Sequence, residues 1–352
     1  MAGLATSVLE RGKDEPVLSD PGGARSTGAR TGHDQKVDTA ERYRRFAREV
    51  LGRSPTYAVL AEAVADNEQV LAFLDALPLA KRQPNLLFAA ARYLLGAPAD
   101  IDALRGLVRD RANELAAVMR ARSTQTNEAA RCATLLPALV GLAEPLALLE
   151  VGAAAGLTLL LDRYSYNYAG HHLPGVDPQA PTLACQPRGP VPLPERLPTV
   201  AWRAGLDLNP LDAANPDGAK WLECLLWPGE GDREARLRDA LVVARRHQPP
   251  VHRGDLVDDL ARVAASAPSH ATLVVYHSAV LAYVDADKRR AFELAVRDLN
   301  AVWLSNEAPG VVPLPAAPPP HPDRADSFTL IRNGIELLAF TDSQGTWIDW
   351  VS

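Results

Sequence analysis

The sequence predicts a doubly wound α/β protein: a mostly parallel sheet with an antiparallel C-terminal hairpin, preceded by an all-helical subdomain. Residues 145–162 pass from an apolar run through two glycines into an Ala/Leu-rich stretch, which indicates a buried strand, a tight turn and a helix. Later apolar runs of strand length alternate with amphipathic stretches. Residues 39–142 carry apolar residues at three-to-four spacing, as packed helices do.

Length, charge and cysteine usage narrow the function classes. A chain of 352 residues can bury a large core, and one large domain with a smaller one is expected. The formal net charge of -6 gives no electrostatic footprint for nucleic acid or an anionic membrane, so we expect neither partner. Cys132, Cys185 and Cys224 lack paired spacing and the histidines lack a metal-binding arrangement. We therefore expect reduced thiols, a cytoplasmic location and no metal.

The chain divides into three parts. Residues 1–38 are polar and aperiodic, which predicts a disordered tail. Residues 39–144 are expected to form the helical subdomain or lid, with helices over 40–51, 57–64, 68–76, 85–95, 100–103 and 112–122, and a further helix from Thr126 to Gly141. Residues 145–352 are expected to form the α/β domain, with a Pro- and Gly-rich insertion near 165–199 at the sheet edge.

Within the α/β part, strands and helices are expected to alternate. Strands are predicted to start at 145 and to cover 199–207, 250–254, 271–278 and 301–307, with helices at 217–227, 232–247, 257–265 and 285–300. Residues 327–332, 335–342 and 346–351 alternate like an antiparallel meander, and Asn333-Gly334 suits a two-residue turn.

The bend after the first strand is the candidate ligand edge. Gly152 and Gly156 permit a tight turn and close approach of a ligand to the backbone. A helix opening near Ala154 would point free N–H groups and a positive dipole end at that space. Ala154 and Leu157 stand where a dinucleotide fingerprint has glycines, and no P-loop occurs. The alternative is a tight strand-to-helix turn without a ligand.

The pattern Glu150-x-Gly152-x-Ala154-x-Gly156 resembles the first motif of class I S-adenosylmethionine-dependent methyltransferases, with Ala154 where a third glycine is usual. The resemblance implies a Rossmann-like, methyltransferase-type sheet. It also implies S-adenosylmethionine as the cofactor, held by Glu150, Gly152 and Gly156.

Two aspartates extend this resemblance. Asp207 would bind the ribose hydroxyls of the cofactor and Asp255 its adenine amine. Asp207 follows the bend by more than the roughly 20 residues usual for such an acid. As alternatives, Asp207 is a turn residue before Asn-Pro, and Asp255 is the N-cap of the next helix.

The stretch 122–132 is expected to bring Asn127, Glu128 and Arg131 to the carboxyl end of the sheet, where ligands bind. We assign Asn127 and Arg131 to the cofactor site. The alternative is helix capping with an Arg131–Glu128 pair at three-residue spacing. This stretch, with 149–156, 200–212, 272–283 and 303–307, resembles a bacterial domain of unknown function, family 2332, common in actinobacteria. The resemblance covers the chain from about residue 42 and implies no activity.

Polar residues end the next two strands. His277 and Ser278 close one and Asn306 and Glu307 the other, so we expect them to line one pocket. His277 titrates near neutral pH and could take a proton from an acceptor; a structural histidine bonded to a loop is the alternative. His277, Asn306 and Glu307 are the candidate catalytic residues.

The sequence therefore predicts an S-adenosylmethionine-dependent methyltransferase acting on a small molecule, with the helical part as a lid. One alternative is a non-catalytic, methyltransferase-like protein that binds a nucleotide or a partner. Another is an enzyme that uses the same edge for different chemistry, with His277 as its base. The oligomeric state stays open.

Overall fold

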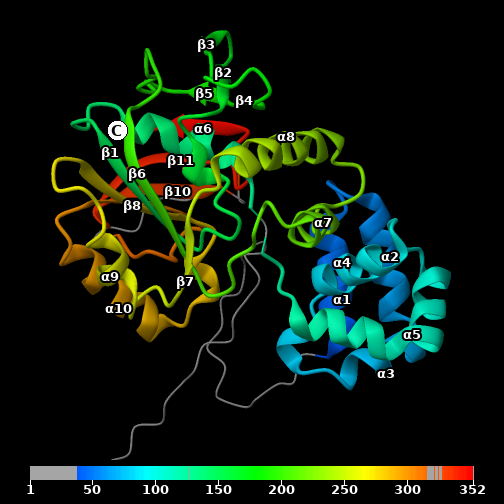
Figure 1. The fold of residues 1–352 in the computed structure, drawn as a ribbon. Helices are drawn as coiled ribbons and strands as arrows, with labels where there is room; N and C mark the ends of the chain where they lie inside the picture. Colours follow the sequence, from blue (N-terminus) through cyan, green and yellow to red (C-terminus); the bar gives the residue numbers. More distant parts are fainter. Residues whose placement is uncertain (1–37, 126, 315–320, 322–323, 325–326, 352) are drawn as a thin grey trace, which may run out of the picture.

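The computed structural model describes residues 38–351 except 126, 315–320, 322–323 and 325–326 (Figure 1). Residues 1–37 of the predicted tail and the predicted cap Thr126 therefore lie outside the described residues.

Residues 39–121 form α-helices, as their spacing predicts. They are α1 (Thr39–Val50), α2 (Pro55–Ala65), α3 (Glu68–Asp75), α4 (Pro84–Leu95) and α5 (Ile101–Ala121), with a 3-10 turn η1 (Leu79–Lys81) before α4. The side chains of Asp38, Asn67 and Asp100 cap three of these helices by accepting from first-turn amides. α5 is one helix where two were expected, and Arg111 interrupts it with a non-helical conformation.

A nine-stranded mixed sheet forms the centre of the α/β part, in the order β5-β12-β11-β10-β9-β8-β1-β6-β7. Its strands are β1 (Leu146–Val151), β5 (Gln186–Arg188), β6 (Val200–Asp207), β7 (Val251–Arg253), β8 (Thr272–Ser278), β9 (Val302–Glu307), β10 (Phe328–Arg332), β11 (Glu336–Thr341) and β12 (Trp347–Trp350). Neighbours from β9 to β7 run parallel, and β9 to β12 pair antiparallel. The predicted α/β class and mostly parallel sheet are confirmed.

The order of the parallel strands reverses beside β1. From β1 the chain goes to β6 and β7 on one side, and then returns to build β8 and β9 on the other. The carboxyl ends of β1 and β8 therefore form a topological switch point, where open α/β sheets bind ligands.

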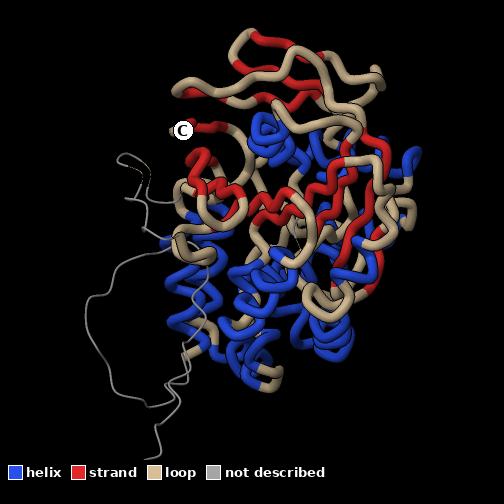
Figure 2. The backbone as a smooth tube through the Cα atoms, turned by 90° about the vertical axis from the view of Figure 1, so that its left-hand side faces the viewer, coloured by secondary structure: helices blue, strands red, loops and turns tan. Residues whose placement is uncertain are grey.

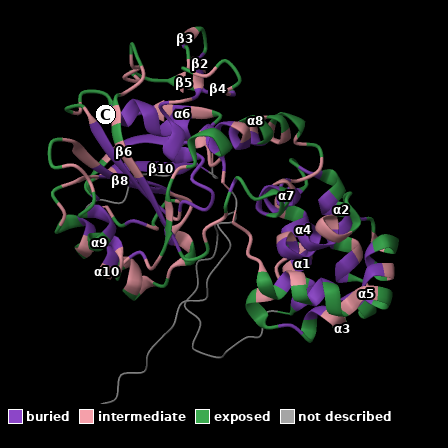
Figure 3. Cartoon of the chain, viewed as in Figure 1, coloured by how far each residue is buried: buried purple, intermediate pink, exposed green. Residues whose placement is uncertain are grey.

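Different elements cover the two faces of the sheet. α9 (Leu260–Ala264) and α10 (Ala286–Arg297) pack on one face, in an apolar cluster with residues of β1, β6, β8 and β9. The other face is covered by η2 (Ala129–Arg131), α6 (Cys132–Leu135), η3 (Leu136–Leu139) and η4 (Thr158–Leu160). Figure 3 shows the central strands as the most continuously buried part of the α/β region.

The helices between β6 and β7 leave the sheet and pack on the N-terminal helices. α7 (Pro216–Cys224) lies beside α2 and α4 in Figure 1, and α8 (Gly231–His247) leads back. Trp221 of α7 is buried, and Trp227 Nε1 donates to Asn85 Oδ1 of α4 at 3.0 Å. As a result, one apolar cluster runs from the N-terminal helices to a face of the sheet.

The prediction of a helix after Gly152 is wrong. Residues 152–163 form turns and the three-residue η4 instead. The backbone explains the difference, because Gly152, Ala154 and Gly156 have φ angles of 72°, 48° and 70°, which a right-handed helix does not contain. The helix expected to run to Gly141 is likewise broken into η2, α6 and η3.

The insertion forms a small sheet of its own. β2 (Ser165–Tyr168) pairs with β3 (His171–Leu173) and with β4 (Thr182–Ala184). Figure 2 shows these short strands above the main sheet. The Pro content of the insertion argued against a central strand, and β5 contains Pro187. It pairs with β12 as the outermost strand, where a missing amide donor is tolerated.

Candidate functional site

The edge segment, residues 122–131, crosses the carboxyl ends of three strands. The chain leaves α5 at Arg122, which is extended, and ends in η2; residue 126 is not described. Three hydrogen bonds fix it, one at each strand end: Gln125 Nε2 to Asp207 Oδ1 after β6 (2.9 Å), Leu157 N to Asn127 Oδ1 after β1 (2.9 Å), and Arg131 Nη1 to the Ser278 carbonyl at β8 (3.0 Å). The predicted position of this stretch at the carboxyl edge is confirmed.

Asn127→Ala is expected to free the Leu157 amide, because that amide donates to Asn127 Oδ1. We expect faster hydrogen exchange at Leu157 and a loss of about 1 kcal/mol in the free energy of unfolding. Thr124→Ala is the matched control, since Thr124 Oγ1 bonds Gln83 and not the bend. Unchanged exchange at Leu157 would contradict the contact.

Asp207 meets the bend as the sequence predicts, but its carboxylate is occupied by the chain itself. It is only 8% exposed. Its oxygens accept from Ala154 N at 2.8 Å, Asn209 N at 2.7 Å and Gln125 Nε2 at 2.9 Å. The role of Asp207 as a ribose ligand stays a prediction, and it would require some of these donors to leave.

The space beside Gly152 is filled by a side chain. A Cβ atom at Gly152 would lie 2.4 Å from Val280 Cγ2, and one at Gly156 would lie 3.0 Å from Pro249 Cγ. The Gly152 amide donates to the Leu206 carbonyl. Glycine is thus needed here for close packing within the protein. With Asp207 bonded to the same bend, these residues do not fit S-adenosylmethionine as they are arranged.

Glu150 at the end of β1 points into the protein. It is 5% exposed, and Thr158 Oγ1 donates to its Oε1. Within the described residues Oε2 has no hydrogen-bond partner, and neither has the neighbouring Tyr276 hydroxyl. Burial raises the pKa of Glu150 to about 8, and the Asp207 charge adds to this rise against the Thr158 bond. The carboxyl group is therefore mostly protonated at neutral pH.

Asp255 is not the N-cap of the next helix, because α9 begins after Asp259; its carboxylate closes the turn ahead of α9. Its Oδ1 accepts from Val257 N at 2.9 Å, ahead of α9, and its other oxygen forms an ion pair with Lys288 of α10. Contact with an adenine amine stays a prediction.

His277 is fully buried between two partners. Its Nδ1 lies 2.7 Å from Glu307 Oε1, and its Nε2 accepts from Trp303 Nε1 at 3.0 Å. Glu307 Oε1 also accepts from Val280 N at 2.8 Å and Leu281 N at 3.0 Å. These bonds fix a neutral imidazole with its proton on Nδ1. A base role for His277 stays a prediction, and it would require this network to open.

Asn306 faces the other side of the sheet from these residues. It is fully buried, donates to Ser278 Oγ at 3.2 Å and accepts from Thr341 Oγ1 at 2.7 Å. Neighbouring residues of a strand point to opposite faces. The structure therefore brings His277 and Glu307 together and separates Asn306 from them.

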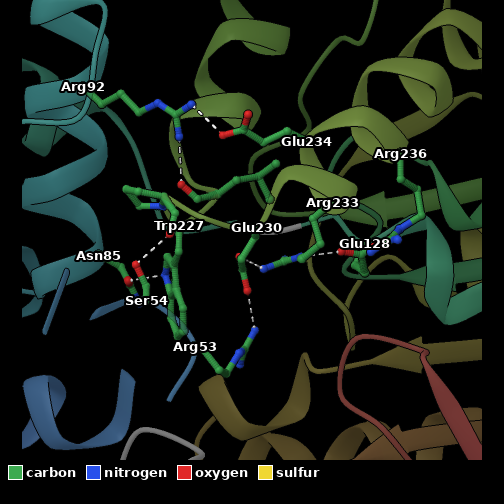
Figure 4. Close-up of polar contacts among 12 residues, drawn as sticks. Arg53, Ser54, Asn85, Arg92, Glu128, Trp227, Glu230, Arg233, Glu234 and Arg236 are labelled. Carbon is green, nitrogen blue, oxygen red and sulfur yellow. Dashed lines mark hydrogen bonds and ion pairs between the residues drawn. The ribbon is translucent and has the colours of Figure 1, made fainter. Parts of the chain in front are cut away.

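A buried carboxylate with two arginines is a feature that the sequence did not reveal. Glu128 is 6% exposed, and its oxygens accept from Arg233 Nε at 2.8 Å and Arg236 Nε at 2.9 Å (Figure 4). The expected Arg131–Glu128 pair does not occur among the ion pairs of the described residues. The Arg-x-x-Arg spacing in α8 was the available signal, but it also fits a solvent-exposed helix face.

Glu230 continues the cluster toward the N-terminal helices. It accepts from Arg233 Nη1 at 2.5 Å and from Arg53 Nη2 at 3.1 Å, so it lies between the two guanidinium groups in Figure 4. Arg92 of α4 bonds Glu234 of α8 nearby, at 3.0 Å.

Two pockets lie away from this edge. One of about 280 Å³ is bounded by α10 and residues 310–313, and one of about 460 Å³ by residues 173–176 and 195–200. The part of the chain that the structure describes holds no group of three His, Cys, Asp or Glu side chains suited to a metal ion. None of its helices has the length and apolar character needed to cross a membrane.

Comparison with known proteins gives one match. A family model described as "Uncharacterized protein conserved in bacteria (DUF2332)" matches residues 40–350. No curated protein and no solved structure matches the chain.

Proposed function

Since the chain belongs to this uncharacterised bacterial family, we propose its function from its geometry: it is a non-catalytic, methyltransferase-like protein that binds a nucleotide or a partner. One observation carries the proposal. The carboxylate of Asp207, which the resemblance assigns to a cofactor, is held by three donors of the chain itself.

The energetics of that carboxylate support the proposal. Hydrogen bonds to a charged group contribute about 1.5–3 kcal/mol each. Ribose hydroxyls would replace such bonds and not add to them, so a ligand would gain little from Asp207. A ligand that entered beside Gly152 would also require Val280 to move, because Val280 Cγ2 lies only 2.4 Å from the position of a Cβ atom on residue 152. The proton-accepting nitrogen of His277 is bonded to Trp303 inside the protein, which gives no support to general-base chemistry at this edge.

An S-adenosylmethionine-dependent methyltransferase is the second candidate. The reversal of strand order at β1 and β8 favours it, and so does the meeting of Asp207 with the glycine bend. Methyl transfer needs an aligned acceptor and does not always need a base. Binding would then have to displace Gln125 from Asp207.

Calorimetric titration separates the two candidates. We expect no saturable heat when S-adenosylmethionine or S-adenosylhomocysteine is added to the full chain, which means a Kd weaker than about 1 mM. ATP and NAD serve as parallel titrants for the nucleotide-binding arm.

Saturable S-adenosylmethionine binding that Asp207→Asn abolishes would overturn the proposal in favour of the methyltransferase. Gln125→Ala is the matched variant, because it removes one donor from Asp207 and leaves the bend intact. Tighter S-adenosylmethionine binding in that variant would support the second candidate as well.

A further inference from the structure

Arg131 carries a partly buried guanidinium group that forms no ion pair with a carboxylate of the described residues. Its Nε donates to the Ser343 carbonyl at 2.8 Å and its Nη1 to the Ser278 carbonyl at 3.0 Å. Within the described residues no hydrogen bond of its Nη2 occurs. Burial lowers the pKa of Arg131, Glu128 opposes this shift, and the charge of Arg233 adds to it. The site therefore holds a cation at an electrostatic cost.

Three further arginines lie near Arg131. Four guanidinium groups gather here, but in the described chain only two carboxylates bond to any of them: the cations are Arg53, Arg131, Arg233 and Arg236, and the anions are Glu128 and Glu230. Glu307 and Asp342 act on Arg131 and Arg53 from beyond ion-pair distance. Guanidinium groups outnumber their bonded carboxylates by two.

We propose that this arginine cluster binds the phosphate group of a small molecule. It lies where Arg131 meets the end of β8, beside the switch point, between the edge segment and α8. The side chains of Arg233 and Arg236 are 13% and 16% exposed. Arg233 Nη1 donates to Glu230, so within the described residues Arg233 Nη2 and the two terminal nitrogens of Arg236 stay outside these bonds. A phosphate carries about two negative charges and three acceptor oxygens, which suits the planar donors of three arginines.

The inference deepens the proposed function, because it names the ligand chemistry of the same edge. A monocarboxylate is a poorer match, since Glu128 already supplies one to Arg233 and Arg236. Free phosphate and a phosphate ester share the recognised group, and the experiment separates them.

The test is thermal unfolding of the full chain in sodium phosphate, sodium acetate and sodium chloride at equal ionic strength. Phosphate near saturation is expected to raise Tm by roughly 2–4 °C over chloride, and acetate to give no rise. Ribose 5-phosphate and adenosine monophosphate form the ester arm. A larger rise with an ester than with inorganic phosphate identifies a phosphorylated ligand, and an equal rise identifies free phosphate.

Two variants and one control locate the effect. Arg131→Met is expected to remove the phosphate-dependent rise. Arg236→Met should at least halve the rise, and it keeps the test decisive if loss of the Arg131 carbonyl bonds unfolds the edge. Arg238→Met removes the same charge from α8, but its side chain is 58% exposed and pairs with Glu234 outside the cluster. This control should keep the full rise.

Equal Tm values in phosphate and chloride would overturn the inference, and so would an undiminished rise in Arg236→Met. Neither result touches the proposed function. The proposed function fails on S-adenosylmethionine binding in calorimetry, which leaves the phosphate result unaffected.

Discussion

The protein is expected to lose stability as pH rises from about 4.5 to about 8. Glu150→Gln is expected to abolish most of this pH dependence. The folded-state pKa of Glu150 is raised to about 8 because the group is buried, whereas an unfolded glutamate titrates near 4.3. Below that lower value both states are neutral and the stability is full. As pH rises, the unfolded state ionises first, and stability falls until the folded pKa is reached. The whole window amounts to roughly 3–5 kcal/mol.

Urea unfolding at several pH values between these limits measures the slope. The glutamine variant resembles the protonated glutamic acid and should give a much flatter profile. Glu144→Gln is the matched control. The partly exposed carboxylate of Glu144 accepts hydrogen bonds from Arg196 and from the backbone N–H of Thr199. Its pKa is lowered, so its contribution is nearly constant above pH 5 and the control profile should keep the parent slope. Equal slopes in the parent and Glu150→Gln would show that Glu150 is ionised in the folded protein.

Glu307→Ala is expected to destabilise the protein by about 3–5 kcal/mol, the usual cost of breaking a buried charged network. One oxygen of Glu307 accepts from His277 and from the Val280 and Leu281 amides. All three donors would be left without an acceptor in a region closed to water, each at a cost of about 1–3 kcal/mol before relaxation.

Glu307→Gln is the control for this prediction, because its amide oxygen can keep the same three donors. It should cost less than half as much as the alanine variant in urea unfolding. Hydrogen exchange at Val280 and Leu281 should accelerate in Glu307→Ala alone. An alanine variant as stable as the parent would contradict the hydrogen-bond network around Glu307.

The sequence predicted the parallel sheet because its strands carry a local signal. β6, β8 and β9 each stop at polar residues, so the position of Asp207, His277 and Glu307 at one edge followed from the rule that parallel strands end together. The registers His277↔Ser305 and Ser278↔Asn306 then put His277 within reach of Glu307.

What the sequence could not predict depends on contacts between distant residues. The Ala/Leu-rich stretch after Gly152 has helical composition, but Asp207 and Asn127 bond its amides from 53 and 30 residues away, and these bonds hold a turn. Glu128 meets Arg233 and Arg236 across more than 100 residues. The periodicity of apolar residues does not predict such pairs, because they depend on the path that the backbone takes through α7 and α8.

The segment with α7 and α8 joins the N-terminal helices to the α/β part of the molecule. Trp227 with Asn85, Arg92 with Glu234 and Arg53 with Glu230 all join the N-terminal helices to a loop that is itself anchored between β6 and β7. A hinge between the regions would have to break these joints at once and expose the indole of Trp221 to water. A lid movement of the N-terminal helices would therefore have to separate these pairs before it could open the edge.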